Sequence, residues 1–258
     1  MKILAVMGSP RKGNTYKAVQ MLEEHMKKLG DVDFQYVFLK DMNLGNCTGC
    51  HLCINKGEDH CPLKDDRARL EQLMQEADGL ILASPVYAMS VTAYMKNYFD
   101  HFSYLWHRPR FFNKKAMSVA TGGGQFKDIL KYMKTNAVSW GYDHVAELGI
   151  PHFDALTEKY RQKALADIAA KAERFYTALT EQKKEAPSFG KIMWFRMWRI
   201  NANACKDSNP CDYAYWTEKG WLRSDFYYDV KIGFLKRVFV PYAERAALGF
   251  MRKIYKGY

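Results

Sequence analysis

The stretch that decides the fold is residues 1–15, MKILAVMGSPRKGNT. It begins with an apolar, partly β-branched run that stops at Gly8, as expected for a buried strand. The polar loop SPRKGN follows, and Thr15 opens a pattern with apolar residues at helical spacing. That apolar side comprises Ala18, Val19, Leu22, Met26 and Leu29. The sequence therefore predicts a strand, a short polar loop and a helix.

The same alternation continues along the chain. Further strands are expected at 33–39, 79–84, 116–120 and 144–150. Helices are expected at 66–77, with Asp65 as N-cap, then through 94–102, after 125, and at 157–179. This order predicts an α/β fold with a doubly wound five-stranded parallel sheet. The loops 8–15, 84–90 and 121–125 follow strand carboxyl ends, where ligands of such sheets bind.

Composition limits the class of protein. Hydrophobic residues make up 48% of the 258 residues, which is enough for a packed core. No apolar run approaches the roughly 18 residues of a membrane span. The initial apolar run is too short for a secretory leader. We therefore expect a cytoplasmic protein.

The loop 8–15 has the composition of a phosphate site. A helix N-terminus offers unpaired N–H donors and a partial positive charge. Side chains of the loop add further donors and positive charge. These are Ser9, Arg11, Lys12, Asn14 and Thr15. An ordinary polar turn between strand and helix is the alternative interpretation.

Two better-known phosphate motifs do not match this loop. The Walker pattern finds its glycines at Gly8 and Gly13 but has Asn14 where it requires lysine. The dinucleotide pattern GxGxxG is absent from the loop. A magnesium nucleoside triphosphate is therefore not expected here.

GSPRKGNT at 8–15, together with ASPVY at 83–87, resembles the NADPH-dependent FMN reductase group of flavodoxin-like proteins. The resemblance covers about residues 1–180 and implies a flavodoxin-like FMN-binding domain. It implies that the FMN phosphate is held by Ser9, Arg11, Gly13, Asn14 and Thr15. It implies that the isoalloxazine and ribityl chain are wrapped by Pro85, Val86, Tyr87, Ala88 and Met89, and lined on the other side by Thr121, Gly122, Gly123 and Gln125.

These loops also suit a flavin chemically. Tyr87 can supply an aromatic wall, and the glycines at 122–124 let the backbone approach a ring closely. A core aromatic at a strand end and a flexible glycine loop are the alternatives.

Four of the six cysteines fall in the loop 47–61, with the pattern Cys47-x2-Cys50-x2-Cys53-x7-Cys61 followed by proline. Such clustering indicates a metal or cluster rather than a disulfide framework. Bacterial ferredoxins use a related run with a shorter last gap. The loop resembles that of the iron–sulfur flavoproteins, which implies that these four cysteines hold a [4Fe–4S] cluster beside FMN. Zinc, with His51 or His60 able to replace a thiolate, and plain thiols remain alternatives. Cys205 and Cys211 are expected to serve packing or to be thiols.

Residues 190–258 form a basic, aromatic extension. They hold 13 Lys and Arg against 6 Asp and Glu, and 16 of the chain's 38 aromatic residues. The polar stretch 181–188 marks its boundary, and 191–204 and 231–255 are amphipathic. Packing on the flavin domain or on a partner subunit is favoured. Contact with a membrane surface is the second interpretation, and nucleic acid is not expected.

The leading functional hypothesis is an FMN-dependent oxidoreductase that moves electrons from NAD(P)H or ferredoxin to a small-molecule or redox-protein acceptor. Hydride transfer to a flavin needs no protein acid or base, so no catalytic residue is named. The rival hypothesis is a non-enzymatic electron carrier between protein partners. A homodimer or higher homo-oligomer is expected from the resemblance.

Overall fold

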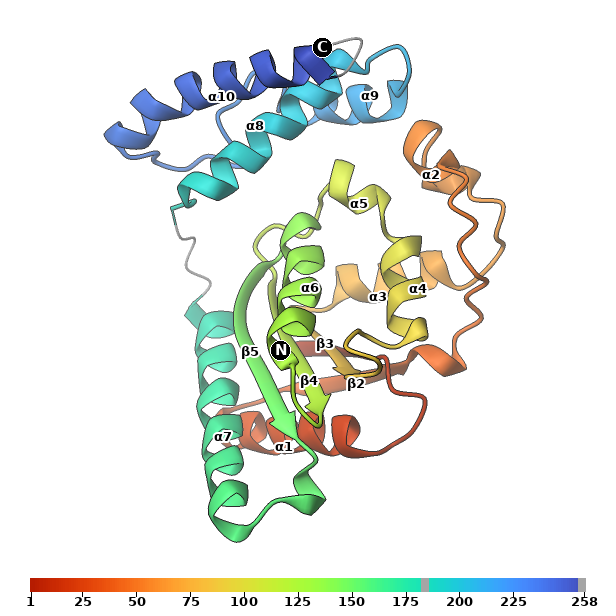
Figure 1. Ribbon diagram of the computed structural model, residues 1–258, viewed down its shortest axis with the longest axis vertical. Coiled ribbons are helices and arrows are strands. Elements are labelled where there is room, and N and C mark those ends of the chain that lie inside the picture. The colour runs from red at the N-terminus through yellow and green to blue at the C-terminus, as the bar shows by residue number, and fades with distance from the viewer. Residues whose placement is uncertain (182–185, 255–258) are drawn as a thin grey trace. The chain divides into compact units, whose positions relative to one another are not determined.

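The computed structural model describes residues 1–181 and 186–254 (Figure 1). The chain forms two compact units. We call Met1–Gly49 with Leu63–Lys183 the sheet unit, and Cys50–Pro62 with Lys184–Tyr258 the helical unit. Part of the expected boundary at 181–188, and the last residue of the amphipathic stretch 231–255, lie outside the described residues.

The sheet unit contains five parallel strands in the order β2-β1-β3-β4-β5. They are β1 (Lys2–Met7), β2 (Asp33–Phe38), β3 (Gly79–Pro85), β4 (Lys115–Gly122) and β5 (Asp143–Pro151). This is the flavodoxin-like order, and the predicted fold class is confirmed. The order reverses between β1 and β3, so the loops that leave these two strands diverge to opposite faces and open a crevice at their carboxyl ends.

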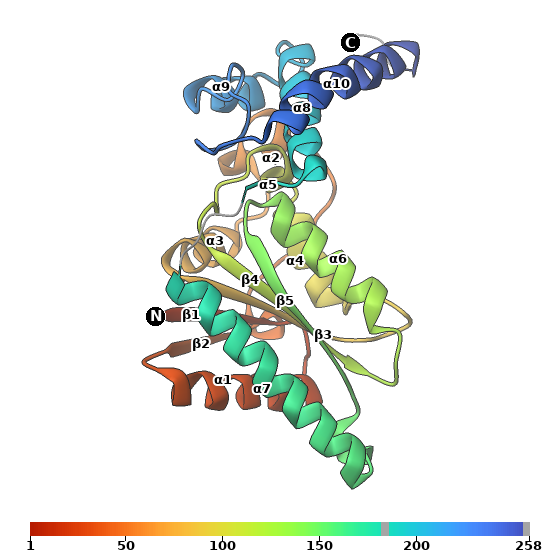
Figure 2. The same cartoon turned by 90° about the vertical axis from the view of Figure 1, so that its left-hand side faces the viewer.

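Helices cover both faces of the sheet (Figure 2). α1 (Asn14–Leu29) and α7 (Glu158–Glu181) pack together on one face. The other face carries α3 (Arg67–Glu76), α4 (Ala93–His101) and α6 (Phe126–Ser139), with the short α5 (Tyr104–His107) after α4. The single turns η1 (Leu39–Asp41) and η3 (Phe153–Ala155) complete the described helical segments of this unit.

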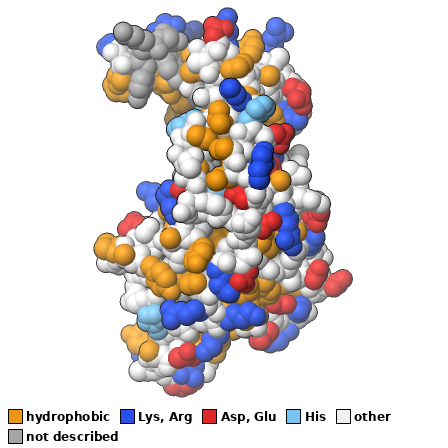
Figure 3. All heavy atoms as spheres, turned by 90° about the vertical axis from the view of Figure 1, so that its right-hand side faces the viewer, with side chains coloured by type: hydrophobic (Ala, Val, Ile, Leu, Met, Phe, Trp, Pro, Cys, Tyr) orange, Lys and Arg blue, Asp and Glu red, His pale blue; other side chains and the backbone are white. Residues whose placement is uncertain are grey.

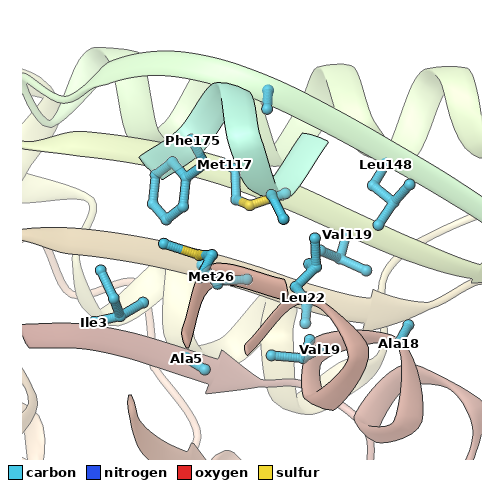
Figure 4. Close-up of a cluster of buried hydrophobic side chains, with 14 of the residues drawn as sticks. Ile3, Ala5, Ala18, Val19, Leu22, Met26, Met117, Val119, Leu148 and Phe175 are labelled. Atoms are coloured by element: carbon cyan, nitrogen blue, oxygen red, sulfur yellow. The ribbon is translucent and has the colours of Figure 1, made fainter. Parts of the chain in front are cut away.

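The core between the sheet and the α1–α7 face is apolar and closely packed (Figure 4). Ile3 of β1, Met117 of β4 and Phe175 of α7 are fully buried there. The predicted apolar side of α1 is buried at Ala18, Val19, Leu22 and Met26, whereas Leu29 in its last turn is exposed. Each fully buried Val, Leu or Met side chain contributes about 1.5–3 kcal/mol, so this face fixes α1 and the loop before it.

The start of α3 differs by one residue from the expectation. The N-cap is Asp66, and Asp65 precedes it with contacts of its own. The Asp65 carboxylate accepts a hydrogen bond from the Arg67 N–H at 3.1 Å and lies 3.0 Å from Nε2 of the buried His101. Asp65 therefore ties the entry of α3 to α4.

The helical unit consists of α2 (Leu52–Asn55), the turn η2 (Glu58–His60), α8 (Phe189–Ala204), α9 (Pro210–Glu218) and α10 (Phe234–Ile254). It has an aromatic core of its own. Phe195 stacks on Trp216 with ring centroids 5.4 Å apart, and Trp221 meets Trp216 edge-on at 5.3 Å. The indole N–H of Trp221 donates to the Tyr227 carbonyl at 2.9 Å. Many of the extension's aromatics are thus used inside this unit.

Candidate functional site

The loop between β1 and α1 leaves a helix N-terminus open. α1 begins at Asn14 with no side-chain cap at Gly13, and the first helical hydrogen bond runs from Lys17 N–H to the Gly13 carbonyl at 3.0 Å. Ser9 folds the loop, because its hydroxyl donates to the Arg11 carbonyl at 2.7 Å and accepts the Arg11 N–H at 3.2 Å. A Cβ at Gly13 would meet no protein atom within 4 Å. The first N–H groups of α1 therefore have no side-chain cap, and the start of the helix can accept an anion.

Three of the loops singled out from the sequence meet here. The hydroxyls of Thr15 and Thr121 are 2.6 Å apart and buried. Arg11 donates through Nη2 to the Tyr87 hydroxyl at 3.2 Å. The Val86 N–H donates to the Thr121 carbonyl at 2.8 Å. The structure thus brings together residues from 8–15, 84–90 and 121–125 at the carboxyl edge of the sheet.

The loop after β3 is a tight, strained turn. Tyr87 and Ser90 exchange two backbone hydrogen bonds of 2.9 Å, so Ala88 and Met89 form a two-residue connection. Both have positive φ, 46° and 62°, which glycine or asparagine adopts more readily. Tyr87 is 41% exposed and Met89 67% exposed. This exposure contradicts the alternative that Tyr87 is a core residue, and strain in an exposed loop is typical of a binding site.

The glycines after β4 differ from one another. A Cβ at Gly122 would lie 2.9 Å from the Val86 Cβ, so this glycine permits the close approach of the two loops. At Gly123 a Cβ would meet nothing within 4 Å. Gln125, with φ of 58°, is the N-cap of α6. The backbone of the loop 121–125 is therefore uncovered at Gly123, where no other part of the protein lies close to it.

Sequence reasoning missed the loop after β5. The Asn14 amide nitrogen lies 3.3 Å from Nδ1 of His152, and Lys17 pairs with Asp154 at 2.9 Å. Since β5 ends at the same sheet edge, the rule that selected the other three loops also applies to this one. It carried no recognisable motif.

Thr92 was missed as well. Its hydroxyl donates to the Gly8 carbonyl at 2.7 Å and accepts the Met95 N–H at 3.2 Å. One side chain therefore caps α4 and binds the start of the loop 8–15.

The two basic residues of the loop are held differently. Lys12 lies over the rings of Tyr16 and Phe38, with Nζ 5.6 Å from each centroid, in a cation–π arrangement. Arg11 instead turns to Tyr87. Figure 3 shows hydrophobic side chains beside lysine and arginine side chains on one face of the protein. At the site itself, Arg11 places a positive charge beside the exposed ring of Tyr87, as a phosphate-bearing aromatic ligand requires.

The four cysteines of the loop 47–61 divide between the units. Cys47 belongs to the sheet unit, where its N–H donates to the Asn97 side-chain oxygen at 3.0 Å. Cys50, Cys53 and Cys61 belong to the helical unit. Among residues 1–181 and 186–254, no three His, Cys, Asp or Glu side chains are grouped as metal ligands would be. The thiols suit an iron–sulfur cluster in type and spacing, whereas their positions do not form a ligand group.

Cys211 of α9 also lies at this loop. A Cβ at Gly57 would be 3.5 Å from the Cys211 Sγ and 3.9 Å from Nδ1 of His60. Its packing against the loop agrees with the expected structural role for this residue.

Comparison with known proteins decides the family. The sequence profile of the NADPH-dependent FMN reductase family matches residues 1–141. The chain belongs to this family. An iron–sulfur flavoprotein of Archaeoglobus fulgidus is 29% identical over 228 residues, covering 86% of this chain and all of that protein. Another, from Methanosarcina thermophila, is 35% identical over 136 residues, covering 50% of this chain and 69% of that protein.

Among solved structures, the NAD(P)H:quinone oxidoreductase of Methanothermobacter marburgensis superposes with a TM-score of 0.52 at 15% identity, covering 67% of this chain and 97% of that one. This likeness supports the fold.

Membership in the NADPH-dependent FMN reductase family confirms the resemblance drawn from the two loop motifs. The protein is an NAD(P)H-dependent FMN oxidoreductase, and FMN is its cofactor. In the described part of the chain, no helix is both long and apolar enough to cross a membrane.

Proposed function

We propose that FMN binds where the loops after β1, β3 and β4 meet, with its phosphate at the N-terminus of α1. The hydrogen bond between the Thr15 and Thr121 hydroxyls, 2.6 Å apart, supports this proposal most directly, because it joins two of the loops beside an uncapped helix start. The N–H groups of the first turn and the Asn14 amide supply donors to the phosphate. Ser9 shapes this loop, because its hydroxyl is bonded to the backbone of Arg11. Arg11 supplies the positive charge.

The isoalloxazine lies, in this proposal, between the strained turn after β3 and the loop 121–125. Tyr87 offers an aromatic wall, and the uncovered backbone at Gly123 offers donors to the polar edge of the ring. Pro85, which closes β3, is buried and holds the turn on the sheet. Bound FMN supplies hydride acceptance and the release of electrons. The exposure of Met89 leaves the turn accessible to a second substrate.

We propose NAD(P)H as the hydride donor and a small molecule or redox protein as the electron acceptor. Ferredoxin as donor stays a prediction. A homodimer or higher homo-oligomer, expected from the family, also stays a prediction. NAD(P)H oxidation with quinones, nitro compounds or free flavin as acceptors tests the activity. If none of these acceptors supports turnover and the protein only exchanges electrons with redox proteins, the carrier hypothesis holds instead.

We also propose that Cys47, Cys50, Cys53 and Cys61 hold a [4Fe–4S] cluster. Support comes from four thiols with ferredoxin-like spacing and from relatives whose names include iron–sulfur. No ligand group is formed among the described residues, so the proposal rests on the chemistry and the spacing of the thiols. No step of the flavin reaction proposed above depends on this cluster.

The phosphate assignment is tested with charge and amide variants of the loop. Arg11→Gln and Asn14→Ala should each weaken FMN binding by about 10- to 100-fold, because a hydrogen bond to a charged group is worth roughly 1.5–3 kcal/mol. Titration of FMN into the apoprotein, followed by flavin fluorescence, measures this. Lys17→Gln is the matched control, since Lys17 lies one turn further along α1 and pairs with Asp154. Equal affinities for all four proteins would contradict the assignment.

A further inference from the structure

The C-terminal helix α10 exposes several large apolar side chains. The side facing α8 holds the buried Val240 and also Glu244, the one acidic residue in this helix. Glu244 pairs with Arg196 at 3.3 Å and with Arg199 at 2.6 Å. The ion pairs of Glu244 therefore lie on the side of α10 that faces the helical unit. A surface helix normally places mainly apolar residues on that side.

The outer side of α10 is a stripe of exposed apolar side chains. With about 100° of rotation per residue, its members share roughly one third of the helix circumference. Five of them are between 40% and 69% exposed: Leu235, Val238, Phe239, Tyr242 and Phe250. We call these five residues the outer stripe. Because such a continuous patch is unfavourable in water, it indicates a surface that something else covers.

The charges around the outer stripe have one sign. Arg245, Arg252 and Lys253 are exposed, and the helix holds five basic residues against the single internal Glu244. A second copy of the chain is a poor occupant, because a two-fold contact would bring these like charges together. An anionic lipid surface matches both the apolar stripe and the positive flank.

We propose that α10 lies along an anionic membrane surface, with the outer stripe inserted among the acyl chains and the arginines among the headgroups. The helix has 21 residues and is therefore about 30 Å long, with Pro241 inside it. This attachment is peripheral and reversible, because one such helix does not span the bilayer. The inference does not depend on where FMN binds.

The test is flotation of the full-length, FMN-loaded protein with vesicles. Vesicles of phosphatidylcholine containing about one third phosphatidylglycerol should bind at least about tenfold more protein than phosphatidylcholine alone, and high salt should release it. Phe239→Gln with Phe250→Gln keeps the charge and should lower binding about tenfold or more. Arg245→Gln with Arg252→Gln should reduce the preference for anionic lipid.

The matched control is Leu29→Gln with Tyr160→Gln, which removes two exposed apolar side chains from α1 and α7 at constant charge. It should bind vesicles as the unchanged protein does. Circular dichroism and flavin content establish that all variants are folded. No vesicle binding, or equal binding to both lipid mixtures, would overturn the proposal. A dimer that dissociates in the Phe239→Gln, Phe250→Gln variant, with no vesicle binding, would assign the outer stripe to a second copy.

Discussion

The pairing of Ser118 with His144 shows how a single residue couples this fold to pH. The Ser118 hydroxyl lies 2.9 Å from Nε2 of His144, on neighbouring strands β4 and β5. Burial, reinforced by the charge of Lys134, lowers the pKa of His144 from 6.5 to about 4. The folded protein therefore holds this imidazole neutral in a pH range where the unfolded chain protonates it.

The consequence is a loss of stability in acid. Because the folded pKa lies below the unfolded one, the contribution of His144 is complete above about pH 6.5 and is lost as pH falls towards 4. The lowered pKa corresponds to about 3 kcal/mol of stability. His144→Gln should thus reduce the difference in unfolding free energy between pH 7.5 and pH 4.5, measured by urea denaturation. Identical differences in both proteins would contradict this account.

Gly122 illustrates a limit of sequence reasoning at the same scale. The glycine run after β4 predicted close approach of the backbone to a ligand. At Gly122, however, a Cβ would clash with Val86 of the neighbouring loop, so this glycine allows two parts of the protein to pack together. Only the folded structure distinguishes a glycine that fits the protein to itself from one that leaves room for a ligand, as at Gly123.

At the scale of elements, the strand runs were predictable because they are continuous and apolar. β3 is buried along its whole length, and its predicted range 79–84 agrees with Gly79–Pro85. α9 was not predicted, because it is short and no helical period distinguishes it from its aromatic surroundings. The loop after β5 was missed since His152 and Asp154 act through contacts distant in sequence. The order of strands and helices along the chain predicts the sheet edge at which the loops meet. The side-chain contacts within and between those loops depend on packing and cannot be predicted from that order.

The turn after β3 offers a test at this scale. Ala88 and Met89 have positive φ, and non-glycine residues in this conformation cost about 1 kcal/mol each. Ala88→Asn with Met89→Gly should therefore raise the unfolding free energy of the apoprotein by about 1–2 kcal/mol. Asn113→Gly is the control, because asparagine already tolerates its φ of 72° and little should be gained. A less stable double variant in chemical denaturation would show that the turn stores no strain.

At the scale of the whole molecule, the cysteine loop and the flavin loops are separate segments. We therefore expect Cys50→Ser to remove protein-bound iron while FMN stays bound, because none of the flavin-loop contacts described above involves this residue. Metal analysis and flavin spectra of anaerobically purified protein measure the two independently. Cys205→Ser, at the end of α8, is the control and should keep the iron. Stoichiometric zinc in the unchanged protein would favour the zinc interpretation, and absence of any metal would favour plain thiols.

The helical unit is built from two segments that lie far apart in the sequence, and this affects the order in which it can fold during synthesis. Residues 50–62 leave the ribosome early, yet α2 packs on α9, which is made only after the whole of Leu63–Lys183. At about 5–20 residues per second this delay is on the order of ten seconds. The sheet unit can complete all five strands in that time. Cys50, Cys53 and Cys61 are therefore synthesised well before α9, the helix on which their segment packs.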